Sequence, residues 1–343
     1  MSKLQVKVAV VGLDRWSTSL ALALREQNQQ PKAALQFVIT GQDERKDHLR
    51  TAQELGALDA VEEKMRLVVR QADIVLLSMP PRDLEFAYDV FGGQLKPGAV
   101  VLDLSPAKLA AVALAEKHLP RDAEGHSQAY LVGVYPLVHN DYLYDTNREV
   151  SAAHRHLFLG SDLLISPAAN VPGEAIKVAS DLAEILQMRS RFMTPDELDA
   201  LIHFTETLPL LVSLGLFRAM REQDGGQERE RSINPNLARF LNLPREMGAK
   251  DVAALLGQHQ PFLVPHLDAL ISSLQGLRAD LATQSAEGLA DLARKHQAAL
   301  ENWEDQRLKN NWGQEAPPEI TRGGMLGGVL GFGGLGRNDR SRR

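Results

Sequence analysis

The turn at residues 11–19 has the composition expected of a phosphate-binding corner. It follows an apolar, β-branched run and leads into strong helix formers, so a glycine stands just before a helix N-terminus. Free amides and the helix dipole favour an anion at such a position. We expect this turn to bind the diphosphate of a dinucleotide through Gly12, Leu13, Arg15, Trp16 and Ser17.

The turn departs from the usual G-x-G-x-x-G spacing, which would place glycines at positions 14 and 17. Asp14 stands at the first of these positions, and its carboxylate would obstruct and repel phosphates. Arg15 brings a positive charge, and the hydroxyls at residues 17–19 could replace the missing backbone contacts. A structural strand-to-helix turn without a ligand stays open as the alternative.

Two further strand ends carry polar residues suited to a nicotinamide dinucleotide. Asp43 follows the second apolar strand, where an acid would bind the ribose hydroxyls of NAD. Arg45 and Lys46 come directly behind it and would suit the 2′-phosphate of NADP, so both cofactors stay open, as does an ordinary solvated helix start. Ser78 and Pro80 end a later strand, where they could shape a shelf for the nicotinamide or simply end the strand.

Apolar runs alternate with helical stretches through the first half of the chain. The predicted strands are Val6–Val11, Leu35–Thr40, Ile74–Met79, Val100–Leu104 and Leu131–Tyr135. The predicted helices between them include Asp47–Leu55, Leu84–Phe91 and Lys108–His118, and a strand or hairpin beginning at Leu157 closes the series. This alternation predicts an α/β fold with right-handed crossovers, a Rossmann-like doubly wound parallel sheet.

After about Gly173 nearly every segment has a helical pattern, so an all-helical C-terminal domain is expected. A capped helix start at Thr194 leads through His203 and Glu206, which we interpret as polar residues on the surface of the helix, into the apolar stretch Leu208–Phe217. That stretch suits either a buried core helix or a homodimer interface. Further helices are predicted at Asp251–Leu256, Leu263–Leu281 and Gly288–Leu308.

These patterns divide the chain into three parts. We expect a dinucleotide-binding domain at residues 1–170 and a helical substrate and dimerisation domain at residues 171–310. The glycine- and arginine-rich tail at residues 311–343 is expected to be disordered, because its glycines would make an ordered state entropically costly.

Composition excludes several function classes. The 343 residues carry a net charge of −6 with mixed signs, which gives no general attraction for nucleic acid. The chain has no cysteine, which excludes disulfides and thiolate chemistry and fits a cytoplasmic location. The histidines are scattered without a ligand spacing, so no metal is expected. No apolar run approaches the roughly 20 residues of a membrane helix, so no membrane span is expected.

Several segments, taken in order, resemble one known family. They are Val10–Gly12, Ser19–Leu24, Gly41–Asp43, Ala72–Pro80, Leu95–Asp103, Lys108, Val132–Pro136, Leu157–Gly160, Ile165–Pro167 and Leu208–Pro209. Their order resembles the prephenate/arogenate dehydrogenase family, within the wider group typified by 6-phosphogluconate dehydrogenase. The resemblance implies a dinucleotide domain, a helical domain that dimerises, a small-molecule substrate, and oxidative decarboxylation of prephenate or arogenate on the way to tyrosine.

The resemblance also points to catalytic residues, although two family positions are changed here. The family's histidine in a Gly-Gly-His-Pro segment is Tyr135 in this chain, and an unperturbed tyrosine of pKa about 10 is a poor base at neutral pH. His139 follows shortly and could take over as the base. The serine of the family's Gly-Ser-x-Lys segment falls on Pro106, with Ser105 one place earlier and Lys108 kept.

Three functions compete on this sequence. The first is an NAD(P)-dependent dehydrogenase of the prephenate type, with Arg239 binding the substrate carboxylates through its guanidinium. The second is a catalytically silent relative that keeps the fold as a binding or regulatory module. The third is a related reductase of a keto acid or an imine, for which the missing histidine matters less.

Overall fold

The computed structural model describes residues 3–31, 33–310 and 312. The chain forms two compact units, residues 1–199 and residues 200–319, of which the described parts are treated separately below. The disorder expected for residues 311–343 concerns residues that, apart from residue 312, lie outside the described part. The domain boundary expected at residue 170 stays a prediction.

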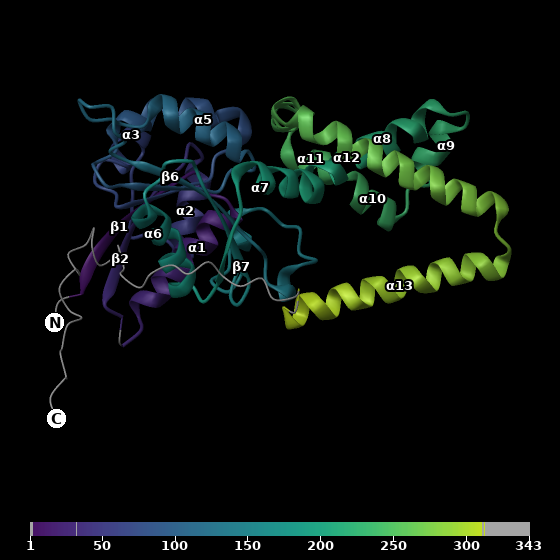
Figure 1. Cartoon of the computed structure of the whole chain (residues 1–343), viewed down its shortest axis with the longest axis horizontal. Helices are drawn as coiled ribbons and strands as arrows, with labels where there is room; N and C mark the ends of the chain where they lie inside the picture. The colour runs from purple at the N-terminus through teal and green to yellow at the C-terminus, as the bar shows by residue number, and fades with distance from the viewer. Residues whose placement is uncertain (1–2, 32, 311, 313–343) are drawn as a thin grey trace. The chain divides into compact units, whose positions relative to one another are not determined.

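The first unit, drawn in purple to teal in Figure 1, is built on a sheet. This sheet has eight strands in the order β3-β2-β1-β4-β5-β6-β7-β8. Its strands are β1 (Leu4–Val11), β2 (Leu35–Gln42), β3 (Ala60–Val61), β4 (Ile74–Leu77), β5 (Val100–Asp103), β6 (Tyr130–Pro136), β7 (Asp162–Pro167) and β8 (Arg189–Phe192). Neighbouring strands are parallel except β6 and β7, which are antiparallel. The predicted Rossmann-like, doubly wound sheet is confirmed.

Helices cover both faces of this sheet, which explains why its central strands are apolar throughout. Every residue of β4 and β5 is buried. The helices α1 (Arg15–Asn28), α2 (Lys46–Glu54) and α6 (Gly173–Ile185) pack on one face, and α3 (Met65–Val68), α4 (Leu84–Phe91) and α5 (Lys108–His118) pack on the other. Four short 3₁₀ turns lie in the connections: η1 (Pro81–Asp83), η2 (Gly92–Gln94), η3 (Asn140–Tyr142) and η4 (Val150–Ala152).

The end of the sheet differs from the sequence prediction. The strand expected from Leu157 begins only at Asp162, because Leu157 and Phe158 anchor a turn in the core instead. The expectation of helix alone after Gly173 is wrong, since β8 follows α6. This strand reads Arg-Ser-Arg-Phe, and such a charged, half-exposed composition is typical of an edge strand but gives little strand signal.

The second unit is helical, as predicted. After α7 (Pro195–Ile202) come a π-helical turn η5 (His203–Thr207), α8 (Leu208–Glu222), α9 (Gly226–Arg231), α10 (Pro235–Leu241), α11 (Leu243–Met247), α12 (Ala249–Thr283) and α13 (Ala286–Lys309). The two helices predicted within residues 251–281 form the single helix α12. His203 is buried beside the ring of Phe262, so its interpretation as a polar residue on the helix surface is wrong.

One helical stretch among the described residues is long and apolar enough to span a membrane by length and composition. It runs from Pro195 to Glu222 and contains an 18-residue window with a mean hydropathy of 1.6, and it is longer than the sequence prediction allowed. The core helix of a water-soluble protein meets the same criterion, so this one stretch does not place the chain in a membrane.

Candidate functional site

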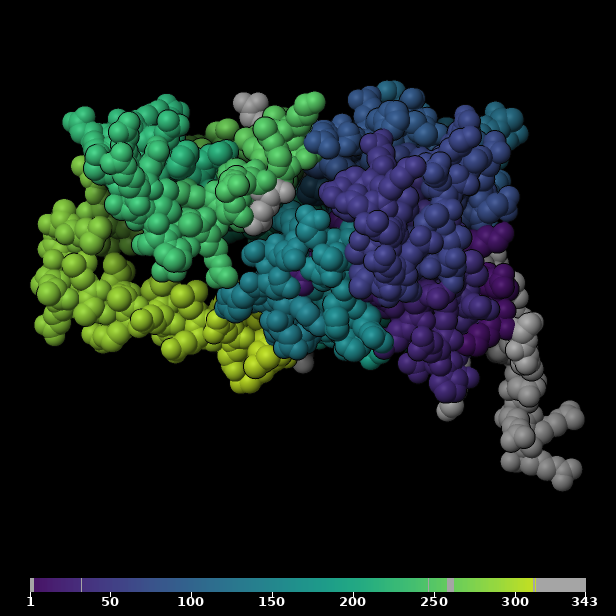
Figure 2. All heavy atoms as spheres, turned by 180° about the vertical axis from the view of Figure 1, so that it is seen from behind, coloured from purple at the N-terminus to yellow at the C-terminus, as the bar shows by residue number. Residues whose placement is uncertain are grey.

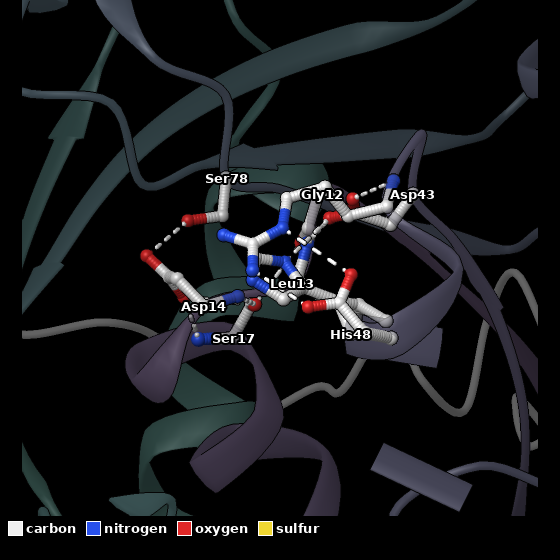
Figure 3. Close-up of polar contacts among 9 residues, drawn as sticks. Gly12, Leu13, Asp14, Ser17, Asp43, His48 and Ser78 are labelled. Atoms are coloured by element: carbon white, nitrogen blue, oxygen red, sulfur yellow. Dashed lines mark hydrogen bonds and ion pairs between the residues drawn. The ribbon is translucent and has the colours of Figure 1, made fainter. Parts of the chain in front are cut away.

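Gly12 makes the sharp turn between β1 and α1, and no other residue fits there (Figure 3). Its φ of +81° lies in the left-handed region, and a Cβ atom would overlap the carbonyl oxygen of Ser78. Its amide donates to the carbonyl of Gln42 at 2.9 Å. The turn is therefore fixed against the ends of β2 and β4, at the carboxyl edge of the sheet where such folds bind ligands.

Asp14 is the N-cap of α1, a role that the comparison of the turn with the G-x-G-x-x-G spacing did not reveal. Its Oδ1 accepts from the amide of Ser17 at 2.8 Å, while its own amide donates to Oγ of Ser17 at 3.1 Å. Its Oδ2 accepts from Oγ of Ser78 at 2.9 Å. Asp14 and Ser17 have the spacing of a capping box, and a carboxylate at this end of a helix also complements the helix dipole.

Asp43 is brought to the same turn from the end of β2 (Figure 3). Its Oδ2 accepts from the amide of Leu13 at 2.7 Å, and its Oδ1 accepts from the amide of Arg45 at 2.7 Å. His48 lies beside it, with Nδ1 3.5 Å from Oδ2. The helix that follows begins at Lys46 with Arg45 as its N-cap, so Asp43 belongs to the glycine turn rather than to the start of α2.

The guanidinium of Arg15 is buried and binds other residues of the same chain. Its side chain is only 4% exposed, and its Nη1 donates to the carbonyls of Asp145 at 2.9 Å and Asn147 at 2.8 Å. Its Nη2 makes an ion pair with Oδ2 of Asp145 at 2.7 Å. Its amide donates to the carbonyl of Arg148 at 3.2 Å. A segment 130 residues further along the chain therefore lies against the first turn of α1.

Trp16 connects the glycine turn to the position of the family's histidine. Its ring meets that of Tyr135 edge to face with centroids 5.0 Å apart, and that of Phe158 at 5.8 Å. Tyr135 lies on β6 with 8% of its surface exposed. The structure thus brings together two residues that the sequence analysis placed in different parts of the site.

A buried polar cluster surrounds Asp103 at the end of β5. The amide and hydroxyl of Ser105 both donate to Oδ1 of Asp103, and the hydroxyl of Tyr88 donates to Oδ2 at 3.2 Å. Nζ of Lys108 lies 3.6 Å from Oδ1 and donates to the carbonyls of Asp103 at 2.7 Å and Val134 at 3.0 Å. Burial, and then the neighbouring carboxylate, raises the pKa of Tyr88 well above its ordinary value.

Asp199 holds the N-terminus of α5, and the sequence analysis did not find it. Its two carboxylate oxygens accept from the amides of Lys108 at 2.6 Å and Leu109 at 3.0 Å. Burial raises the pKa of this carboxyl, although the two amide hydrogen bonds act in the opposite direction. Only the fold reveals the contact, because it joins residues 91 positions apart.

The remaining predicted residues lie apart from these clusters or are exposed. His139 is 36% exposed, and its Nδ1 accepts from the amide of Asp141 at 3.2 Å. Pro80 precedes η1, next to Ser78 and Met79 at the end of β4. Arg239 is exposed on α10 of the helical unit. The roles predicted for these residues stay predictions.

One group of described residues has donors that could hold a metal ion. It consists of Asp122, Glu124 and His126, in the turn between α5 and β6, with ligand atoms within 4.8 Å of one another. Glu124 and His126 are exposed, and exposed acidic groups of this kind are common without an ion. The group carries no metal assignment.

The family is decided by a sequence comparison. The model of the prephenate dehydrogenase nucleotide-binding domain matches residues 20–191, which is half of the chain. This chain belongs to the prephenate dehydrogenase family. Its first unit is therefore a nucleotide-binding domain of that family, although the match begins within α1, after the Gly12 turn.

One relative of known function and two solved structures are similar to most of this chain. A cyclohexadienyl dehydrogenase of Zymomonas mobilis is 23% identical over 297 residues, which are 85% of this chain and 94% of that protein. Prephenate dehydrogenase from A. aeolicus, solved in complex with hydroxyphenyl propionate and NAD+, has a TM-score of 0.71 at 17% identity and covers 88% of this chain and 99% of its own. Arogenate dehydrogenase of Synechocystis has a TM-score of 0.62 at 18% identity, covering 87% and 100%. At these identities the two structures show the fold alone.

Proposed function

We propose that this member of the prephenate dehydrogenase family is an NAD(P)-dependent dehydrogenase that oxidises prephenate or arogenate with loss of carbon dioxide. The observation that carries the proposal is the family match over residues 20–191. The contact between Asp43 and the amide of Leu13 supports it, because it joins the two strand ends that a dinucleotide spans in such a domain.

The residues present fit a nicotinamide dinucleotide, with one contact that has to change. Gly12 and Leu13 would face the diphosphate, and Asp43 would bind ribose hydroxyls, since its carboxylate is already held at the turn. Ser78 and Pro80 would lie beside the nicotinamide. The contact that has to change is the one between the amide of Arg15 and the carbonyl of Arg148. When bound, the dinucleotide supplies the hydride acceptor of the oxidation.

The charges around Asp43 favour NAD over NADP. A 2′-phosphate would be repelled by the carboxylate of Asp43. Arg45 is already paired with Asp47 at 2.6 Å, and Nζ of Lys46 lies 3.8 Å from Glu63. Each of these two bases therefore already has a carboxylate partner.

The proposed catalytic groups are Tyr135, Ser105, Lys108 and His139. A phenolic hydroxyl can donate a hydrogen bond, so Tyr135 would donate one to the substrate rather than act as the family's histidine does. Neutral His139 carries its proton on Nε2 as long as Nδ1 accepts from the amide of Asp141. Lys108 would fix the ends of β5 and β6 that border the site, because its Nζ donates to a carbonyl on each.

A catalytically silent relative is the second candidate function. It is favoured by the tyrosine at the family's histidine position and by the covered amide of Arg15. Titration of the purified protein with NADH and NADPH, followed by nicotinamide fluorescence, tests both proposals. If neither NADH nor NADPH binds at millimolar concentration, the proposal of a dehydrogenase is wrong.

If a cofactor binds, reduction of NAD or NADP in the presence of prephenate and of arogenate, at several pH values, identifies the substrate. Turnover of either compound supports the first proposal. Tight cofactor binding without turnover of either supports the silent relative or a reductase of another substrate.

We also propose that the protein is a cytoplasmic homodimer formed through the helical unit. In this proposal residues 1–170 bind the cofactor, and residues 171–310 bind the substrate through Arg239. Large apolar side chains are exposed on α8 and α12, namely Leu214, Leu216, Phe217, Val264, Ile271, Leu274, Leu277 and Leu281. Burial of such a surface stabilises association. Figure 2 shows that α13, in yellow, also exposes side chains along its length. Sedimentation equilibrium tests the dimer, and cell fractionation tests the location.

A further inference from the structure

The amides at the start of α1 are already engaged by other groups of the same chain. Those of Leu13, Asp14 and Ser17 donate to Asp43, Ser17 and Asp14 in that order. The amide of Arg15, the first residue of the helix, donates to a carbonyl from far along the sequence, that of Arg148. A diphosphate that approaches the helix N-terminus must replace at least one of these partners.

The partner most easily replaced is the segment at residues 145–148, which we call the strap. Residues 144–149 are all exposed, and the chain is buried again only at Val150, which is 2% exposed. The strap contacts α1 through Arg15, whose guanidinium and amide donate to the carbonyls of residues 145, 147 and 148. A segment with so little buried surface can move without unfolding its surroundings.

The strap also neutralises the charge that a diphosphate would need. The buried guanidinium of Arg15 is paired with Oδ2 of Asp145, and the carboxylates of Asp14 and Asp43 lie at the same turn. With the strap in place, the corner therefore offers an incoming anion little positive charge. With the strap released, the same guanidinium is available to a phosphate.

We propose that residues 145–148 act as an internal strap that closes the diphosphate corner, and that Arg15 exchanges Asp145 for the diphosphate when a dinucleotide binds. This inference rests on the proposed dehydrogenase function and adds a regulatory step to its cofactor site. The observed affinity then equals the intrinsic affinity reduced by the fraction of molecules with an open strap.

The test compares Asp145→Asn with Asp89→Asn in the full-length protein. Asp145 is 48% exposed, so its substitution should leave the fold intact, and it weakens the strap by removing the charge of the ion pair. Asp89 is 73% exposed on α4, near His118, and its substitution removes the same charge without touching the strap. Asp145→Asn should tighten NADH binding about two- to fivefold, the range expected when one partly exposed ion pair is lost. Asp89→Asn should bind NADH as the unmodified protein does.

Hydrogen exchange supplies a second readout. NADH should raise the exchange of amides at residues 143–149 in the unmodified protein. These amides close local turns on residues 140–147, and a strap that has left α1 holds those turns less firmly. Slower exchange there would mean that the segment closes over the cofactor, and it would overturn the strap. Equal, measurable dissociation constants for Asp145→Asn and the unmodified protein would also overturn it and leave the dehydrogenase standing. If no form binds NADH or NADPH, both proposals fall.

Discussion

The carboxylate of Asp43 accepts a hydrogen bond from the amide of Leu13 at 2.7 Å. This contact ties the end of β2 to the turn after β1, across 30 residues of sequence. An acid held in this way cannot swing aside to admit a second anion. The same bond that positions a ribose-binding carboxylate therefore also limits which dinucleotide fits.

Replacing Asp43 should change the choice between cofactors. We expect Asp43→Asn to shift the ratio of NADPH to NADH affinity about tenfold towards NADPH, since one negative charge near the 2′-position is removed. Competitive titration with the two reduced cofactors measures the ratio. Asp47→Asn, which breaks the exposed pair with Arg45, is the matched control. A larger shift in the control would place the 2′-phosphate near residue 47 instead.

Gly12 should be the least replaceable residue of the turn. Gly12→Ala combines a φ of +81° with an overlap on the carbonyl oxygen of Ser78, so we expect a loss of about 3–4 kcal/mol in the free energy of unfolding. Urea denaturation followed by circular dichroism measures the loss. Gly93→Ala is the control, because a Cβ there meets nothing within 4 Å. Similar small effects at both positions would contradict the strained turn.

Much of the fold follows from the sequence because its cause is local. The strands β1, β2, β4, β5 and β6 are apolar runs between helical patterns, and they form close to the predicted bounds. The strand β8 was missed because Arg189 and Arg191 give it a polar pattern that its partner Asp162 makes acceptable only in the folded sheet. The two helices predicted within residues 251–281 form the single helix α12 although Gly257 and Pro261, which disfavour a helix interior, lie between them.

The sequence drew attention to the residues of the glycine turn but not to their contacts. The sequence identified Gly12, Asp14, Arg15 and Asp43 as the residues of interest at the turn. It could not show that Arg15 pairs with Asp145, because an ion pair across 130 residues depends on the path of the whole chain. The capping role of Asp14 was available from its spacing to Ser17, and the comparison with a glycine fingerprint hid it.

Asp199 should make stability depend on pH in a definite direction. Burial raises the pKa of this carboxyl in the folded state, so the folded protein binds its proton more tightly than the unfolded chain does. Its contribution to stability is therefore fully present below the ordinary aspartate pKa of about 3.9 and is lost as the pH rises through the folded value.

Comparison with Asp199→Asn, whose side chain cannot titrate, isolates the contribution of Asp199 to the pH dependence of stability. The free energy of unfolding of the unmodified protein, minus that of the variant, should fall as the pH is raised from 4 towards 7. Urea denaturation at each pH measures it. A difference that rises with pH would mean that the amides of Lys108 and Leu109 outweigh burial and lower the pKa.

Replacing Asp14 by glycine should lower the stability of the fold and raise the affinity for the cofactor. Asp14→Gly removes the cap on the amide of Ser17 and the bond from Ser78, so we expect a loss of about 1 kcal/mol in the free energy of unfolding. The same change frees an amide and removes a negative charge from the corner, so NADH should bind about tenfold more tightly. Asp14→Asn separates the two effects, because asparagine caps a helix as well as aspartate but carries no charge. If NADH binds equally more tightly to both variants, the gain in affinity comes from removal of the charge. If only Asp14→Gly binds more tightly, the gain comes from removal of the bulk of the side chain. Unchanged or weaker binding in both variants would show that residue 14 does not face a phosphate.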